Sequence, residues 1–184
     1  MTGHRPTPPP SNAPSPNVLW NWRMFLATGE SRFVDVLELA LYNSVLSGVS
    51  LGGSEFFYTN PMRVTAPLPT ELRWSRTRVP YVSSFCCPPN LARMIAEAGT
   101  YAYAQSPGTV WVNLYGGSTL TTTLDGNRAL TLTQESAYPW DGHIRLTINE
   151  SDGAEFSLKL RIPAWSHGAS FTINGHTEPV EARP

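Results

Sequence analysis

The hydrophobic pattern changes its period near residue 100, and this change limits the folds open to the chain. Before that point, apolar residues recur at helical spacing. After Gly99, apolar and polar residues alternate, and Gly, Asn, Asp and Pro interrupt the alternation at short intervals. Such alternation is typical of an antiparallel β-sandwich. The sequence therefore predicts an α+β chain with a helical part over 17–99 and a β-sandwich over 100–184.

The helical part is expected to contain three helices, at 18–28, 32–47 and 88–99. Asn17 is a suitable N-cap for the first helix and Gly29 a suitable stop. The first helix is apolar around most of its circumference, so it needs neighbours on several sides. A short strand over 56–59 and a loop over 63–82 are expected before the third helix. Three helices of this kind indicate the end of a larger helical domain.

Composition excludes several classes of protein. A hydrophobic fraction of 41% with six Trp allows the 184 residues to bury a core. The net charge of -1 offers no basic surface for nucleic acid. No apolar run approaches the roughly 18 residues of a membrane span. The segment 1–16 holds six prolines and is predicted to be a disordered tail. We expect a cytoplasmic protein, unless a signal segment precedes this sequence, and leave a homo-oligomer open.

The only two cysteines, Cys86 and Cys87, are adjacent and lie where the third helix begins. A disulfide between neighbours would close a strained eight-membered ring. Two soft sulfur ligands at a helix N-terminus, which favours negative charge, suit a metal-bound or reactive thiolate. The alternative is a pair of inert, partly buried thiols.

Six segments of the chain carry a resemblance to a known family. They are Asn-Val-Leu-Trp-Asn-Trp-Arg-Met at 17–24, Asp-Val-Leu-Glu-Leu-Ala-Leu-Tyr-Asn at 35–43, Phe-Tyr-Thr-Asn-Pro at 57–61, Cys-Cys-Pro-Pro-Asn-Leu-Ala-Arg at 86–93, Tyr-Pro-Trp-Asp-Gly at 138–142 and Leu-Arg-Ile-Pro-Ala-Trp at 160–165. In these segments the chain resembles glycoside hydrolase family 127, the β-L-arabinofuranosidase family. The resemblance implies the terminal helices of an (α/α)6 barrel followed by a β-sandwich, in a fragment truncated at both ends.

The resemblance also implies roles for four residues. Cys86 would be the nucleophile and a zinc ligand, and Cys87 a second ligand, in a retaining glycosidase acting on oligosaccharides that contain L-arabinofuranosides. Tyr58 would belong to the substrate pocket, or else be a core aromatic of a strand. Glu38 would be a sugar-binding carboxylate, or else a solvated helix residue.

The remaining zinc ligands of the family, a Glu and a Cys, would fall at Pro10 and Asn12, and neither residue can bind zinc in this way. The general acid/base Glu would lie further upstream. Two sulfur ligands do not close a tetrahedral zinc site. We therefore expect this chain alone to bind zinc weakly or not at all and to have no glycosidase activity.

Two other functions are open. One is a carbohydrate-binding or structural β-sandwich module without catalysis, and the other is a zinc or redox site unrelated to sugars. Trp140 and Trp165 suit a sugar-binding surface, although packing in the sandwich core or between domains is the expected role. Structural or solvated roles are expected for His143, His167 and His176. A solvated loop face is expected for Arg73, Arg76 and Arg78.

Overall fold

The computed structural model describes residues 14–60, 74–84, 86–125, 128–151, 153, 155–178 and 180. Most of the predicted tail, positions 10 and 12, and much of the predicted loop over 63–82, including Arg73, lie outside these residues. The chain divides into two compact units. We call them the helical unit (Met1–Met24 and Val36–Ala98) and the β unit (Phe25–Asp35 and Gly99–Pro184).

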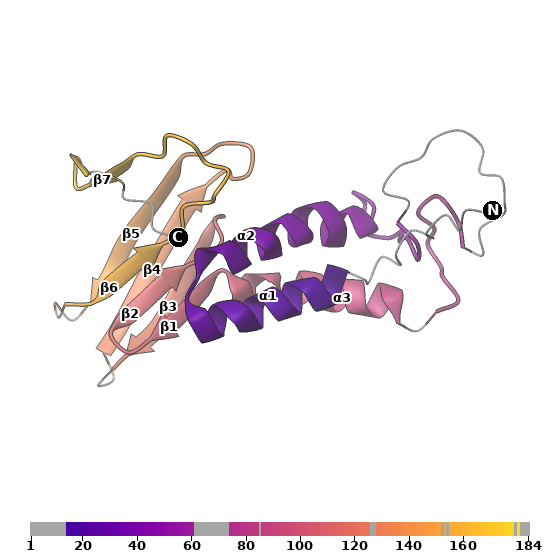
Figure 1. The fold of residues 1–184 in the computed structure, drawn as a ribbon, viewed down its shortest axis with the longest axis horizontal. Coiled ribbons are helices and arrows are strands. Elements are labelled where there is room, and N and C mark those ends of the chain that lie inside the picture. The colour runs from indigo at the N-terminus through magenta and orange to yellow at the C-terminus, as the bar shows by residue number, and fades with distance from the viewer. Residues whose placement is uncertain are drawn as a thin grey trace, which may run out of the picture. The chain divides into compact units, whose positions relative to one another are not determined.

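The helices follow the predicted order but not the predicted bounds (Figure 1). Helix α1 spans Pro14–Thr28, so residues 14–16 are helical rather than part of the tail. The side chain of Asn21 donates to Oδ1 of Asn17 at 2.7 Å, one turn inside the helix. Gly29 ends α1 as predicted, with a φ of 72° and its N–H bonded to the Phe25 carbonyl at 2.7 Å.

The second predicted helix is continuous but changes its winding. Helix α2 spans Ser31–Ala40, the π-helical η1 Leu41–Val45 and the 3-10 helix η2 Leu46–Gly48. Helix α3 spans Cys87–Glu97 and runs into the 3-10 helix η3 Ala98–Tyr101. In the helical unit the buried apolar residues recur at helical spacing, and α3 contacts η1. They include Val18, Leu37, Leu41, Val45, Leu91 and Met94.

Residues 56–59 do not form the predicted strand. Phe56 instead makes isolated bridges to Val49 and Val79, with its N–H bonded to the Val79 carbonyl at 2.9 Å. Arg78 lies in the same part of the helical unit. Its guanidinium donates to the Ser47 carbonyl at 2.6 Å and stacks over the Phe57 ring at 4.6 Å. The prediction that Arg78 belongs to a solvated loop face is therefore wrong.

The β unit contains two three-stranded sheets and a hairpin. One sheet has the order β1-β2-β6 and the other β3-β4-β5. The strands are β1 Tyr103–Ser106, β2 Thr109–Val112, β3 Ser118–Leu124, β4 Arg128–Ser136, β5 Ile144–Ser151, β6 Ser157–Leu160, β7 Phe171–Ile173 and β8 His176–Glu178. All pairings are antiparallel except that of β2 with β6, which is parallel.

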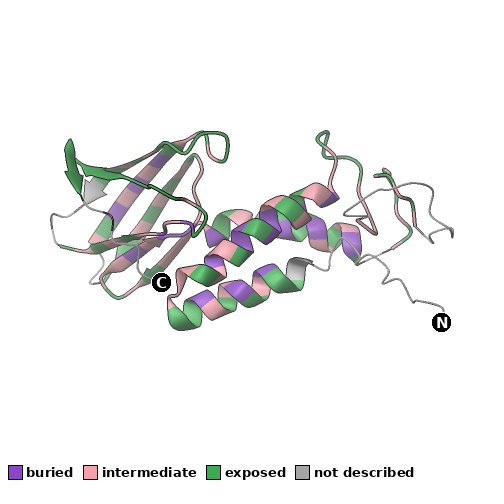
Figure 2. Ribbon diagram, turned by 45° about the horizontal axis from the view of Figure 1, so that its top comes forward, coloured by how far each residue is buried: buried purple, intermediate pink, exposed green. Residues whose placement is uncertain are grey.

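Alternating side chains of both sheets form the core of the β unit (Figure 2). Val110 of β2 packs with Leu124 of β3 and Leu130 of β4 in one buried cluster. Leu120, Phe156 and Leu158 cover this cluster. The predicted fold class, barrel-end helices followed by a β-rich domain, is confirmed.

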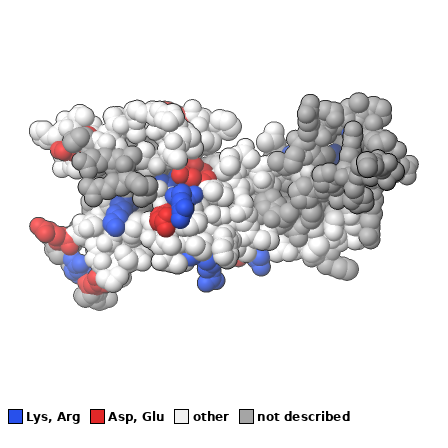
Figure 3. Space-filling model, viewed as in Figure 1, with Lys and Arg blue, Asp and Glu red and all other residues white. Residues whose placement is uncertain are grey.

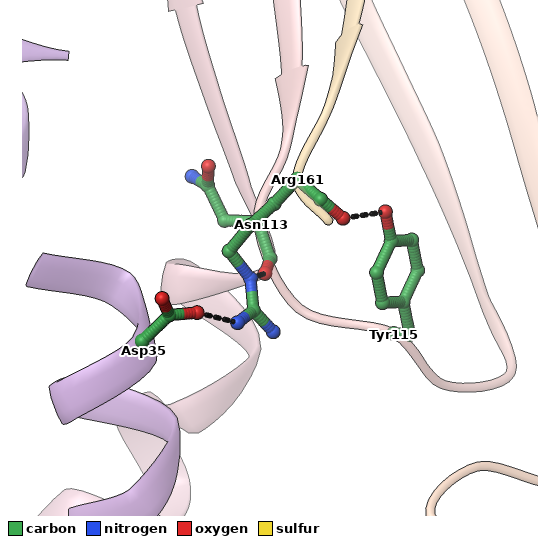
Figure 4. Close-up of polar contacts among 4 residues, drawn as sticks. All are labelled: Asp35, Asn113, Tyr115 and Arg161. Atoms are coloured by element: carbon green, nitrogen blue, oxygen red, sulfur yellow. Dashed lines mark hydrogen bonds and ion pairs between the residues drawn. The ribbon is translucent and has the colours of Figure 1, made fainter. Parts of the chain in front are cut away.

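The segment Phe25–Asp35, which joins α1 to α2, belongs to the β unit. Its Phe25 ring meets Trp111 of β2 edge to face, with centroids 5.6 Å apart. Asp35 forms an ion pair with Arg161, with Nη1 and Oδ1 2.6 Å apart (Figure 4). Nε of Arg161 also donates to the Asn113 carbonyl at 2.6 Å, and the Tyr115 hydroxyl donates to the Arg161 carbonyl. These contacts tie the helix connection to the strands.

Candidate active site

The two cysteines occupy different environments at the start of α3. Cys86 precedes the helix and is exposed, whereas Cys87 is its first residue and is fully buried. Their Sγ atoms lie 3.3 Å apart. Pro88 and Pro89 follow in the first turn, where a proline costs no intrahelical hydrogen bond. The sequence thus begins the helix directly at the thiols and places them near its positive end.

The first thiol is the more acidic one. Ser84 Oγ lies 3.3 Å from Cys86 Sγ. The hydrogen bond from Ser84, followed by one from Cys87, stabilises the thiolate and lowers the pKa of Cys86. Burial, reinforced by the hydrogen bond and the charge of Cys86, raises the pKa of Cys87 to about 11. Cys86 therefore ionises first, with Cys87 as a protonated donor beside it.

Tyr58 lies beside the two thiols. The charge of the Cys87 thiolate, followed by burial, raises the pKa of the Tyr58 phenol, and Cys86 acts in the same direction. The phenol therefore stays protonated when Cys86 is ionised. The Tyr58 ring packs on Trp74 with centroids 4.1 Å apart. It is half-buried in a bend, so the alternative prediction of a core aromatic in a strand is wrong.

Glu38 lies on α2 and is buried, with an exposed fraction of 4%. The alternative that it is a solvated helix carboxylate is therefore wrong. A buried carboxylate requires hydrogen-bond or charge partners. Its role toward a sugar remains a prediction.

Cys86 and Cys87 are ligands of a type that zinc binds, but they supply only part of a zinc site. Two thiols are soft ligands that zinc prefers, and a closed structural site has four ligands. Within the described ranges, no three residues of the types His, Cys, Asp and Glu gather in a group that could hold a metal. Positions 10 and 12 are not among those residues.

The sequence did not indicate three groups that the structure shows. Ser84 and Trp74 contact the predicted site residues, and the buried ion pair of Asp35 and Arg161 supports the β unit. Only for Ser84 does the sequence offer a signal, because it lies two residues before Cys86 and is thus close enough to contact the thiol. The exposure of His143, His167 and His176 agrees with solvated roles. Trp140 and Trp165 are exposed, so packing in the sandwich core is wrong for both.

Among the described helices, none has the length and apolar character needed to cross a membrane.

Comparison with family models covers most of the chain. The model described as the β-L-arabinofuranosidase GH127 catalytic domain matches residues 14–100. The model described as the GH127 middle domain matches residues 109–184. The first match contains four of the six segments that carry the predicted resemblance, and the second contains the other two.

A curated relative and three solved structures are similar to the chain. The non-reducing end β-L-arabinofuranosidase of Bifidobacterium longum subsp. longum is 33% identical over 155 residues, which are 79% of this chain and 23% of the relative. A solved glycoside hydrolase is 46% identical with a TM-score of 0.90, covering 95% of this chain and 29% of that one. A GH127 β-L-arabinofuranosidase from Geobacillus stearothermophilus T6 is 41% identical with a TM-score of 0.78, covering 89% and 26%.

The third structure, a GH127 β-arabinofuranosidase, is 35% identical with a TM-score of 0.78 and covers 95% of this chain and 28% of that one. The chain thus spans about a quarter of the length of these relatives. On the two family models and these likenesses, the chain belongs to glycoside hydrolase family 127.

Proposed function

We propose that the chain carries the nucleophile of a retaining β-L-arabinofuranosidase, with Cys86 as the attacking group. The observation that supports this most is the inequality of the two thiols. Cys86 is exposed and its pKa is lowered, while Cys87 is buried 3.3 Å away with a raised pKa. The relatives named as β-L-arabinofuranosidases supply the substrate class.

The reaction would proceed in two displacements. The Cys86 thiolate attacks the anomeric carbon opposite the leaving oxygen, so a C–S bond forms as the C–O bond breaks. The leaving oxygen takes a proton from a general acid. Water then attacks the same carbon, gives up a proton, and releases Cys86 as a thiolate. Two inversions retain the configuration of the sugar.

The neighbours of Cys86 would assist both displacements. Ser84 and Cys87 hydrogen-bond its sulfur and so favour the thiolate, both as attacking group and as leaving group. Tyr58 stays protonated beside them and can donate to a sugar oxygen. Buried Glu38 would accept hydrogen bonds from sugar hydroxyls.

Cys86 and Cys87 would also hold the zinc ion that the family resemblance implies. When bound, zinc deprotonates the thiols that coordinate it. The chain contains only two cysteines, and the resemblance puts the general acid before residue 10. We therefore propose that the 184 residues alone bind zinc weakly or not at all and do not turn over arabinofuranosides.

A substrate that needs no acid assistance tests the role of Cys86. The chain, with zinc or with a chelator, is incubated with a dinitrophenyl β-L-arabinofuranoside, whose leaving group departs without protonation. Intact-mass measurement and peptide mapping then locate any arabinofuranosyl adduct. We expect one adduct, on Cys86, which persists in Cys87→Ser and is lost in Cys86→Ser.

An adduct on Cys87, or equal labelling of Cys86→Ser, would overturn the assignment of the nucleophile. A separate assay with the less activated nitrophenyl glycoside tests whether the chain is active alone. We expect no release of nitrophenol. Sustained release by the purified chain would refute the expected lack of turnover but leave the nucleophile assignment standing.

A further inference from the structure

Two turns of the β unit expose large aromatic rings. Trp140 lies between β4 and β5 and is 92% exposed. Trp165 lies after β6 and is 61% exposed. Neither side chain contributes to the core of the β unit, where rings of this size are normally placed. In the 184-residue chain both indole rings are therefore open to contact with a ligand.

Aromatic contacts join the two turns. The ring of Tyr138, two residues before Trp140, stacks on Trp165 with centroids 6.3 Å apart and planes inclined by 24°. Tyr115 also contacts Tyr138, with ring centroids 6.1 Å apart and planes inclined by 66°. The Tyr115 hydroxyl in turn donates to the carbonyl of Arg161 (Figure 4). The stack is thus anchored to the buried ion pair of the β unit.

Backbone hydrogen bonds hold both turns in shape. The Trp140 N–H donates to the Ala137 carbonyl at 3.0 Å, and the Ser166 N–H donates to the Pro163 carbonyl at 2.8 Å. The Tyr138 N–H donates to Ser136 Oγ at 3.0 Å. A ligand that binds here would therefore meet rings whose backbone is already ordered, which lowers the entropic cost of binding.

The charges around the rings favour a neutral ligand. Within 137–143 and 161–168 the only Lys or Arg is Arg161, which is buried and paired with Asp35. Phosphate groups of nucleic acids or lipids would find no exposed Lys or Arg in these turns. In the view of Figure 3 the upper edge of the β unit is mostly uncharged, with a few Asp or Glu side chains.

We propose that Tyr138, Trp140 and Trp165, the aromatic surface, bind the sugar rings of a neutral oligosaccharide. The C–H faces of a furanose or pyranose are apolar and pack on indole, while the hydroxyl groups at the ring edge stay in water or bond to turn residues. This function goes beyond the proposed catalysis, because it uses no residue of the thiol site. It would retain a glycan on a protein whose family hydrolyses glycans.

Equilibrium binding to the whole 184-residue chain tests the proposal. The probe is a linear arabinan oligosaccharide, titrated by calorimetry and followed by tryptophan fluorescence. We expect binding, and Trp165→Ala should weaken it by about tenfold, the size expected for loss of one stacked ring. Trp165→Phe should keep most of the affinity because it retains a ring face. Trp140→Ala should weaken binding in the same direction.

Trp20→Ala is the matched control, because Trp20 is 63% exposed but lies on α1 in the helical unit. It should leave the affinity unchanged. Circular dichroism confirms that each variant is folded. No binding by the wild type, or an equal loss in Trp20→Ala and Trp165→Ala, would overturn the proposal. Because no bond is broken, a failure of the proposed catalysis would not change this result.

Discussion

The ion pair between Asp35 and Arg161 predicts a large effect of a single truncation on stability. The side chains are 19% and 2% exposed, and the charged atoms lie 2.6 Å apart. In Asp35→Ala the buried guanidinium loses its carboxylate partner, while its bond to the Asn113 carbonyl stays. Breaking a buried pair costs roughly 3–5 kcal/mol, and the partial exposure of Asp35 brings our expectation to about 3 kcal/mol.

Glu135→Ala is the matched control, since Glu135 and Arg145 form an ion pair at 3.9 Å with side chains 67% and 68% exposed. An exposed pair of this kind contributes about 0–1 kcal/mol. Urea unfolding, followed by far-ultraviolet circular dichroism, gives both free energies of unfolding. In a domain of this size, 3 kcal/mol lowers Tm by roughly 6–12 °C.

A double variant separates the buried charge from the loss of packing. Asp35→Ala with Arg161→Met also removes the buried guanidinium that has lost its carboxylate, so it should be more stable than Asp35→Ala alone. A higher salt concentration should reduce the contribution of Glu135 to the free energy of unfolding but should hardly change that of Asp35. If Asp35→Ala costs no more than Glu135→Ala, the pair does not anchor the helix connection and our account of the β unit is wrong.

Two further substitutions test the thiol environment and the turn after α1. Ser84→Ala removes the hydrogen bond that favours the Cys86 thiolate, so the pKa of Cys86 should rise. Thiol alkylation as a function of pH measures this pKa. Ser83→Ala is the control, because Ser83 is exposed and its loss should leave the pKa of Cys86 unchanged. If Cys86 is alkylated with the same pH midpoint in both variants, the hydrogen bond from Ser84 does not lower the pKa of Cys86. Gly29→Ala and Gly53→Ala both place a side chain at positive φ, which costs about 1 kcal/mol each, but only at Gly29 does the new Cβ meet Trp111, at 3.1 Å. Thermal unfolding should therefore show the larger decrease in Tm for Gly29→Ala. Equal decreases in Tm would mean that Trp111 moves away from the new Cβ at no cost in stability.

The fold class could be predicted because the period of the hydrophobic pattern differs between the two parts. The ends of helices were harder to predict. Asn17 is a common capping residue, yet Pro14 already suits a first turn, and the chain uses it. The π-helical segment Leu41–Val45 keeps the same buried side as a regular helix, so periodicity alone cannot reveal it.

Long-range pairings could not be predicted from the pattern. The alternation in β2 and β6 predicts strands but not their direction, and these two pair in parallel. Arg161 was placed in a motif, but its partner Asp35 lies 126 positions earlier in the chain. The pattern likewise favours a packed role for Trp140 and Trp165 over the exposed one that the structure shows, because large hydrophobic residues are normally assigned to a core.

The thiol pair could be located from sequence but not described. Adjacent cysteines before two prolines predict a helix start with two sulfur atoms near it. Which sulfur is buried depends on how α3 packs, and that packing leaves Cys86 exposed and Cys87 buried. The nearness of Tyr58 depends on the irregular segment that follows η2, which has no periodic signal.

Residue-resolved alkylation of the two cysteines tests whether Cys86 is the reactive thiol and Cys87 its buried partner. The chain is treated with iodoacetamide over a range of pH, and the rates are read from mapped peptides. Only the thiolate reacts, so each rate rises with pH through the pKa of its own thiol. We predict that Cys86 reacts first, with a midpoint below that of an ordinary thiol, and that Cys87 follows with a midpoint of about 11. Equal midpoints, or faster modification of Cys87, would contradict the account.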